Sequence, residues 1–207
     1  MRTITKSQEP QSLKVFNRVH HTEWSDIHDP NNRYVYNDCL EQCKLDQRGL
    51  CAYTEISFND AGTIHIDHYI KRDIDSSLMF SWANLAAAVK DSRYGADHKD
   101  TNVSRKDYSK RLGCYYNLLN PIINNLSGLF KYSADGEIEP INAGDVAAIN
   151  TIRVFNLNES TLKARRKDCM QNVRLLLEGG LNKQEVLNVL SSGGFLSAIE
   201  YELNLVK

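Results

Sequence analysis

The last third of the chain carries apolar residues at helical spacing almost without interruption, and this pattern constrains the fold more than any other feature. Apolar positions three to four residues apart predict helices that pack one face on a core. Asn158, followed by Glu159, supplies an N-cap for one of them. The helices predicted in this region span residues 143–155, 159–178, 183–190 and 194–205.

Four more helical segments are predicted earlier in the chain. Pro10 suits the first turn of one helix, Gly49 closes another, and an Ala-rich run favours a third. The polar stretch 94–102 is a loop or the entry to a further helix. The four segments span residues 10–24, 37–48, 82–89 and 112–126.

Two β-hairpins are predicted, because β-favouring residues twice flank a turn of small and polar residues. The first pairs residues 52–58 with 63–69, and the second lies within 128–141 around a turn at 133–136. The sequence therefore predicts an α+β fold that is mainly helical, with a central hairpin and a second small one.

The composition is that of a folded protein, with 42% hydrophobic and 25% charged residues. No stretch approaches the ~18 consecutive apolar residues of a membrane span, and the first ten residues lack the apolar core of a secretory signal, so we expect a cytoplasmic protein without membrane contact. The five cysteines are too few for a disulfide framework and predict reduced thiols. A net charge of -1 argues against charge-driven, non-specific nucleic-acid binding, although a local basic patch is compatible with it.

The residues that can carry chemistry follow one another in the second quarter of the chain. His68 is a candidate general base, because a neutral imidazole can take a proton from water. Asp67 and His98 are candidate ligands for Mg²⁺ or Mn²⁺, which would neutralise the charge on a scissile phosphate. Asn84 either fixes the loop that carries the base or adds a ligand. Lys99 is the candidate for direct contact with a phosphate.

Strand geometry limits this arrangement, because successive residues of a strand point to opposite faces. The strand must therefore end or bulge at about Asp67 if Asp67 and His68 are to face one ion. His65 shares the face of Asp67 and either assists the metal or is an ordinary cleft histidine. Residues 67–111 carry nine basic and seven acidic side chains, which either position a polyanion or form a solvated face. A second basic cluster at 163–167 is a helix exterior or a partner-facing surface.

Motifs along most of the chain resemble one family, the HNH proteins of bacterial anti-phage systems that form the PtuB subunit of Septu and of some retron systems. The clearest matches are Cys51-Ala-Tyr-Thr-Glu55, Ile66-Asp-His-Tyr69 and Trp82-Ala-Asn-Leu85. The same family pattern is matched by Pro10, Trp24, Phe130-Lys-Tyr132, Asp135-Gly136, Pro140, Leu157-Asn158, Leu162 and Arg165.

The resemblance implies a metal-dependent HNH endonuclease with a ββα-metal core that cleaves nucleic-acid phosphodiester bonds. It implies a PtuA-like ABC-type ATPase as partner and, in retron systems, a reverse transcriptase with its RNA–DNA. It gives His68 the role of base, Asp67 that of metal ligand, Asn84 that of the middle asparagine and His98 the last position. DNA is the family's default substrate, and RNA, including transfer RNA, is the alternative.

The chain also departs from the family pattern. Many relatives hold a structural Zn²⁺ with two cysteine pairs, whereas here only Cys51 stands in place and Thr54 replaces its partner, so structural zinc is not expected. His98 comes later than the last ligand of relatives. These departures favour an alternative function, a catalytically weak regulatory or binding subunit of the ATPase. The expected division is a helical wrap at 1–50, a nuclease core at 51–112 and a helical region with a hairpin at 113–207, packed as one compact unit.

Overall fold

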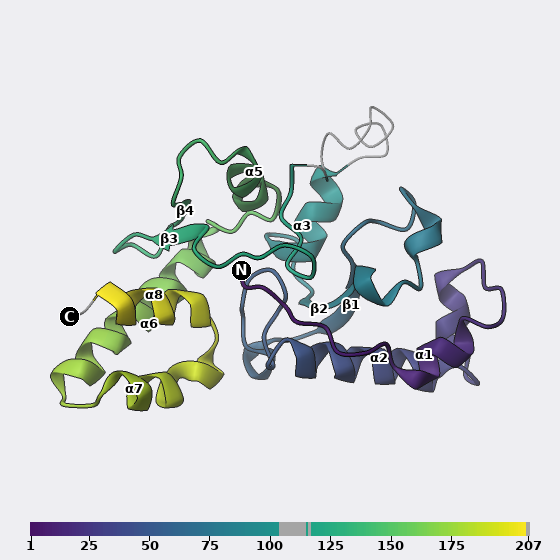
Figure 1. The fold of residues 1–207 in the computed structure, drawn as a ribbon, viewed down its shortest axis with the longest axis horizontal. Coiled ribbons are helices and arrows are strands. Elements are labelled where there is room, and N and C mark those ends of the chain that lie inside the picture. Colours follow the sequence, from purple (N-terminus) through teal and green to yellow (C-terminus); the bar gives the residue numbers. More distant parts are fainter. Residues whose placement is uncertain (104–114, 116, 206–207) are drawn as a thin grey trace.

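The structure is a computed structural model that describes residues 1–103, 115 and 117–205. It is elongated, with helices α6 to α8 at one end, helices α1 and α2 towards the other, and a strand pair beside helix α3 between them (Figure 1). The helices are α1 (Gln11–Phe16), α2 (Arg33–Asp46), α3 (Gly95–Asn102), α5 (Val146–Val154), α6 (Ser160–Glu178), α7 (Lys183–Leu190) and α8 (Leu196–Leu205).

The strands form two antiparallel pairs in the described part of the chain, β1 with β2 and β3 with β4. They span β1 (Ile64–His68), β2 (Leu85–Val89), β3 (Phe130–Tyr132) and β4 (Ile138–Pro140). Short 3₁₀ helices span Trp24–His28, Phe58–Asp60, Ser76–Leu78, Trp82–Asn84 and Ser191–Gly193. The fold is mixed α+β and mainly helical, as the sequence predicts. No helix among the residues described is long and apolar enough to cross a bilayer.

The helices of the last third confirm the prediction from periodicity, with one change at the start of α6. Glu159 is the N-cap, because its side chain accepts the N–H groups of Thr161 and Leu162. Asn158 instead accepts the N–H of Ile138 at 2.8 Å. Asn158 therefore holds strand β4 against the start of α6 and does not cap the helix.

The second predicted hairpin is confirmed by strands β3 and β4. Phe130 is paired with Pro140, and the turn closes where the N–H of Gly136 donates to Ser133 at 2.9 Å. Gly136 has a φ of +77°, and a Cβ there would lie 2.1 Å from the carbonyl oxygen of Lys163. The turn thus needs glycine, because it packs directly on the backbone of α6.

The first predicted hairpin is wrong in its pairing. Strand β1 pairs with β2, in a regular register from Ile64 opposite Val89 to His68 opposite Leu85. Residues 52–57 form turns, and their strand-like pairing is limited to an isolated bridge between Leu50 and Ser57. The turn carries Tyr53, which is fully buried, so its β-favouring residues fill the core without forming a strand.

The Ala-rich run predicted as a helix is strand β2, and all five of its side chains are buried. Ala86 and Ala88 belong to the largest core, whereas Leu85 and Ala87 belong to a second one. This alternation is that of a strand with both faces covered, which reads in sequence as a continuous apolar run. The strand contacts α2 and α3, and burial on both sides outweighs the helix propensity of alanine (Figure 1).

The remaining predicted helices are confirmed only in part. Helix α1 ends at Phe16, well before residue 24, and α2 begins four positions earlier than expected. Residues 117–126 form turns, while 112–114 and 116 lie outside the described residues. The side chains of Asn120 and Asn124 accept backbone N–H groups of Ile122 and Asn120, so local side-chain bonds replace helical ones. The polar stretch 94–102 forms helix α3.

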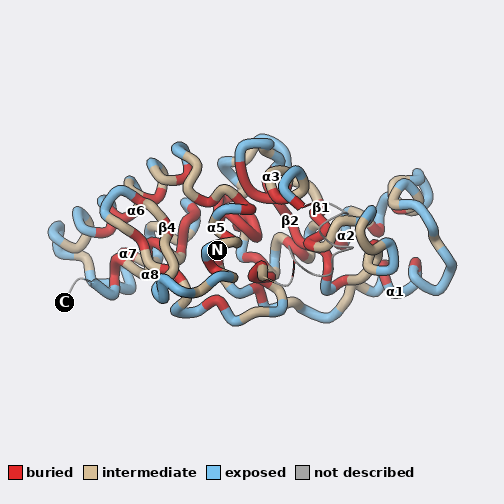
Figure 2. The backbone as a smooth tube through the Cα atoms, turned by 90° about the horizontal axis from the view of Figure 1, so that it is seen from above, coloured by how far each residue is buried: buried red, intermediate tan, exposed pale blue. Residues whose placement is uncertain are grey.

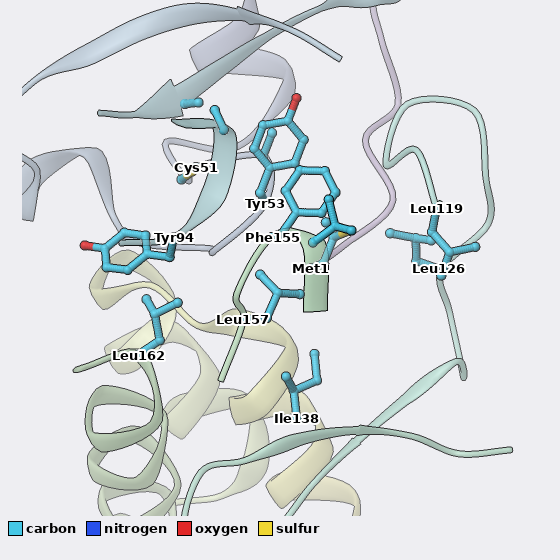
Figure 3. Packing of buried hydrophobic residues seen from close by; sticks show 14 of the residues in the cluster. Met1, Cys51, Tyr53, Tyr94, Leu119, Leu126, Ile138, Phe155, Leu157 and Leu162 are labelled. Atoms are coloured by element: carbon cyan, nitrogen blue, oxygen red, sulfur yellow. The ribbon is translucent and has the colours of Figure 1, made fainter. Parts of the chain in front are cut away.

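The core runs through the molecule from α6 to α2, with exposed residues on its outer turns (Figure 2). In its largest cluster the rings of Tyr53 and Phe155 lie 4.6 Å apart, with Leu157 next to them (Figure 3). The same cluster includes Ile4, so it draws residues from all three segments into which the sequence was divided. This shared core fixes the end of strand β1, where the candidate site residues lie.

Candidate functional site

The candidate site lies at the end of strand β1, whose last two residues are Asp67 and His68. Both line a cleft of about 410 Å³ together with His65, Lys71 and Arg72. The strand pairs regularly through His68 without a bulge, so the two side chains leave on opposite faces. Asp67 contacts Tyr53 and helix α3, whereas His68 contacts Trp24.

Asp67 is a buried carboxylate with an exposed fraction of 4%. Tyr53 donates its hydroxyl to Asp67 Oδ2 at 2.5 Å, and the ammonium of Lys99 lies 3.3 Å from the same oxygen. Burial raises the pKa of Asp67, and the positive charge of Lys99 opposes that rise. Tyr53 thus becomes part of the site as the hydrogen-bond donor to Asp67.

Lys99 is fully buried, with its ammonium surrounded by oxygen atoms. It donates to the carbonyl oxygens of His68 at 2.7 Å and Tyr69 at 3.0 Å, and it pairs with Asp100 at 2.7 Å and with Asp67. A hard metal cation prefers a similar set of oxygen ligands. Lys99 therefore fills a cation position beneath the cleft and does not present its charge to a phosphate in this arrangement.

His98, also on helix α3, faces helix α5. Its Nδ1 is 2.8 Å from the carbonyl oxygen of Val154 in α5, so the structure does not bring His98 and Asp67 together at one point. Within the described ranges no group of three His, Cys, Asp or Glu side chains is placed to hold a metal ion. A divalent ion between Asp67 and His98 does not fit this arrangement, because Lys99 pairs with the carboxylate and His98 faces another helix.

His68 is held as a neutral imidazole. Its Nε2 donates to the carbonyl oxygen of Met79 at 2.8 Å, and in this tautomer Nδ1 keeps a lone pair. Burial lowers the pKa of His68 to about 3, with further lowering by the charges of Arg72 and Lys99. The ring is therefore unprotonated at neutral pH, although a pKa this low makes it a weaker base than a free imidazole.

Asn84 fixes the loop that follows His68. Its amide nitrogen donates to the carbonyl oxygens of Ile70 at 3.0 Å and Leu78 at 3.2 Å, and its Oδ1 accepts the N–H of Ile70 at 2.8 Å. Its own carbonyl oxygen accepts the N–H of Tyr69. Of the two roles that the sequence leaves open for Asn84, these bonds match that of fixing the loop.

His65 lines the cleft on the same strand as Asp67, and its Nδ1 is buried without a hydrogen-bond partner among the described residues. Lys71 donates to the carbonyl oxygen of Asp100 at 2.9 Å, and Arg93 is paired with Asp91. Arg72 is exposed at the cleft, with no ion pair to an acid in the described part of the chain. Four of the nine basic residues between 67 and 111 lie outside the described residues, namely Arg105, Lys106, Lys110 and Arg111.

The second basic cluster, on helix α6, is largely used within the molecule. Arg166 is buried and donates to the carbonyl oxygens of Gly136 and Leu157. The other members pair with acids: Lys163 with Glu137, Arg165 with Asp60 and Lys167 with Asp135. These contacts attach α6 to the second hairpin and to residue 60, and they leave little free positive charge.

Residues from the N-terminal segment, which motif spacing does not place at the site, complete the surroundings of His68. The ring of Trp24 lies 4.4 Å from that of His68, and the guanidinium of Arg72 lies 5.7 Å from the centre of the Trp24 ring. Next to them, Arg33 lies 5.2 Å from the ring of Tyr36. The one sequence sign of this surface is the alternation of aromatic and basic residues from 24 to 36.

The four described cysteines are free, and Cys114 lies outside the described residues. Cys39 and Cys43 are buried on α2, and burial raises the pKa of the Cys39 thiol to about 12. Cys51 accepts the N–H of Val89 through its sulfur, and Thr54 accepts that of Ile56. These residues are engaged in packing and in backbone hydrogen bonds.

No protein-family model matches the chain, and no curated protein is significantly similar to it.

Proposed function

We propose that the chain is an HNH endonuclease that hydrolyses nucleic-acid phosphodiester bonds, with the cleft at the end of β1 as its active site. The observation that supports this most is the state of His68, a neutral imidazole on the cleft wall whose Nδ1 keeps a lone pair. Arg72 lines the same cleft and carries a free positive charge. A base and a cation in one cleft both assist water attack on a phosphodiester.

In the proposed reaction, His68 Nδ1 takes a proton from the attacking water as the water oxygen bonds to phosphorus. The P–O bond to one sugar oxygen breaks, and that oxygen takes a proton from solvent. Arg72 holds the negative phosphate. A positioned general base contributes about 10²–10⁴-fold to such a rate. Asn84 keeps the loop after His68 in place through its bonds to Ile70 and Leu78. The Mg²⁺ or Mn²⁺ that the resemblance implies needs a different placement of Lys99 and His98, so we assign it no step.

The resemblance also supplies the proposed context. The chain would act as the nuclease subunit of an anti-phage complex with a PtuA-like ABC-type ATPase and, in a retron system, with a reverse transcriptase and its RNA–DNA. DNA is the default substrate of that family, and RNA, including transfer RNA, is the alternative.

A second candidate function is a catalytically weak subunit that binds and regulates the ATPase. One observation favours it: Lys99 occupies the oxygen-lined position next to Asp67, and His98 faces α5. The position of His68 on the wall of the same cleft as Arg72 favours the enzyme.

Removal of the proposed base separates these two functions. We expect His68→Ala to lower cleavage at least ~10²-fold, because the base is lost. Asn84→Ala should lower it as well, because the loop loses three hydrogen bonds. The measurements are phage protection by the whole complex, and sequencing of DNA breaks and RNA ends in cells, which identifies the substrate.

The matched control is His20→Ala, which removes an exposed histidine far from the cleft residues in sequence. It should behave as the unmodified protein. If His68→Ala and Asn84→Ala keep full protection while the complex still copurifies, the enzymatic function is wrong and the regulatory subunit is the better account.

A further inference from the structure

An aromatic and basic surface borders the cleft on the side of the N-terminal segment. The ring centroids of Trp24 and Tyr36 lie 6.3 Å apart, and those of His28 and Tyr36 lie 4.7 Å apart. All three rings are half-buried, so each keeps some solvent-exposed area. We call the following set the Trp24 surface: Trp24, His28, Arg33, Tyr36 and Arg72.

The Trp24 surface is continuous with the proposed active site. Trp24 meets His68 edge to face at 4.4 Å, and Phe80 supports the Trp24 ring from one side at 5.5 Å. Arg72 belongs both to this surface and to the lining of the cleft. A ligand that reaches from the cleft over Arg72 therefore meets these rings next.

The two arginines of this surface carry positive charge without a counter-charge. Arg33 and Arg72 are exposed, and neither forms an ion pair with an acidic side chain that the structure describes. Arg33 donates to His28 Nδ1 at 3.0 Å, and the charges of both arginines, after burial, lower the pKa of His28. Both guanidinium groups therefore place positive charge close to the His28 ring.

The acids of the same segments have other partners. Asp26 accepts the N–H groups of Thr22 and Glu23, Asp29 accepts that of Asn31, and Asp73 lies 3.8 Å from Lys71. Guanidinium groups left free in this way bind phosphate oxygens well, since their donors match a phosphate's geometry. The two guanidinium groups are therefore the part of this surface that is complementary in charge to a nucleic-acid backbone.

The aromatic rings of the Trp24 surface favour single-stranded over duplex nucleic acid. A base stacks on an aromatic side chain only when it is unpaired and splayed out, whereas a duplex presents phosphates and hides its base faces. Rings interleaved with arginines, next to a phosphodiesterase cleft, match a single strand.

We propose that the Trp24 surface binds an unpaired nucleotide flanking the bond that is cleaved at His68, with Arg33 and Arg72 on its phosphates and its base against Trp24 or Tyr36. The substrate is accordingly single-stranded nucleic acid, or an unpaired loop within a folded one. This inference rests on the proposed function of the cleft.

Tryptophan fluorescence tests the contact without cleavage. The chain has two tryptophans, and Trp82 is only 8% exposed with Lys6 over its ring, so a Trp82→Phe protein reports on Trp24 alone. The probes are oligothymidylate, oligouridylate and the duplex of oligothymidylate with oligoadenylate, in the presence of a chelator. We expect both single strands to quench Trp24 emission and to bind more tightly than the duplex.

Substitutions then assign the contact in the chain that keeps Trp82. Trp24→Ala should weaken single-strand binding about tenfold, and Trp24→Phe should restore most of it because a ring is kept. Arg33→Gln and Arg72→Gln should each weaken binding and flatten its dependence on salt. Arg153→Gln, an exposed arginine of α5, is the matched control and should change neither. Thermal unfolding of each variant verifies the fold.

Equal or tighter duplex binding, or single-strand binding without quenching and without sensitivity to Trp24→Phe or Trp24→Ala, overturns this inference. The outcomes remain separable from those of the proposed function. Quenching with no cleavage by any form of the complex rejects the nuclease and keeps the surface. Cleavage that depends on His68 but not on Trp24 rejects the surface and keeps the nuclease.

Discussion

Burial at the end of a strand keeps His68 in its neutral form. The folded protein lowers the pKa of this imidazole to about 3 from its ordinary value of 6.5, because the charged ring would lose most of its hydration. The bond from Nε2 to Met79 opposes this shift without cancelling it. A base of this kind stays unprotonated throughout the neutral range.

The lowered pKa makes stability depend on pH. Above a pH of about 6.5 the ring is neutral in both the folded and the unfolded chain, so it contributes nothing. Below that pH the unfolded chain takes up a proton that the folded protein binds only near pH 3, and stability falls. We expect His68 to cost about 2 kcal/mol at pH 5 relative to pH 7, measured by urea unfolding.

The control for this prediction is His68→Gln, which keeps a donor for Met79 but does not titrate. Other groups, such as Asp67, titrate in both proteins, so the difference between the two pH profiles isolates His68. A difference that is the same at pH 5 and pH 7 would show that the folded imidazole titrates normally.

Lys99 joins helix α3 to strand β1 and is the main link between these two elements at the site. Its ammonium contacts Asp67 and the carbonyl oxygens of His68 and Tyr69. A buried ion pair of this kind adds little compared with an apolar pair, but removal of one partner leaves an unpaired buried charge. Helix α3 also packs on β2, and Lys99 adds a charged link from α3 to β1 whose removal leaves Asp67 without its counter-charge.

We therefore expect Lys99→Met to lower the free energy of unfolding by about 3–5 kcal/mol at pH 7, because Asp67 remains buried without its counter-charge. The double variant Asp67→Asn with Lys99→Met should recover part of this loss, since the buried charge of Asp67 is then removed and the remaining partner of Lys99, Asp100, is partly exposed to water. Lys90→Met, at an exposed lysine next to the same hairpin, should have little effect. Urea unfolding of the three proteins tests this, and equal stability of Lys99→Met and Lys90→Met would disprove it.

Strand β2 shows how an element depends on its neighbours. Leu85, Ala86, Ala87 and Ala88 favour a helix by local propensity, yet their side chains alternate between two cores. Residues 85–89 form a strand because both faces of this segment are covered and its backbone pairs with β1. The helix propensities of these residues do not show which distant elements will cover them.

At the scale of the whole molecule, Gly194 lies where the C-terminal helices meet the segment before β1. It has a φ of +92°, and a Cβ there would lie 2.7 Å from the carbonyl oxygen of Glu55 and 2.9 Å from the nitrogen of Ser57. Beside it, the N–H groups of Phe195 and Ser197 donate to Glu55. This close backbone approach connects residues far apart in the sequence.

Gly194→Ala should therefore lower the free energy of unfolding by about 1–3 kcal/mol, from backbone strain and displacement of residues 55–57. Gly193→Ala is the matched control, because a Cβ at that position meets nothing within 4 Å. Thermal or urea unfolding distinguishes them, and indistinguishable variants would mean that this contact is not required.

The sequence by itself determined the C-terminal helices, the second hairpin and the adjacency of Asp67 and His68. Each of these depends on spacing or turn residues that lie close together in the chain. The tertiary structure alone decided that β1 pairs with β2, that Lys99 rather than His98 reaches Asp67, and that Trp24 lies against His68. Those outcomes depend on which distant surfaces are buried together, and the free energy of that burial is absent from any local pattern of residues.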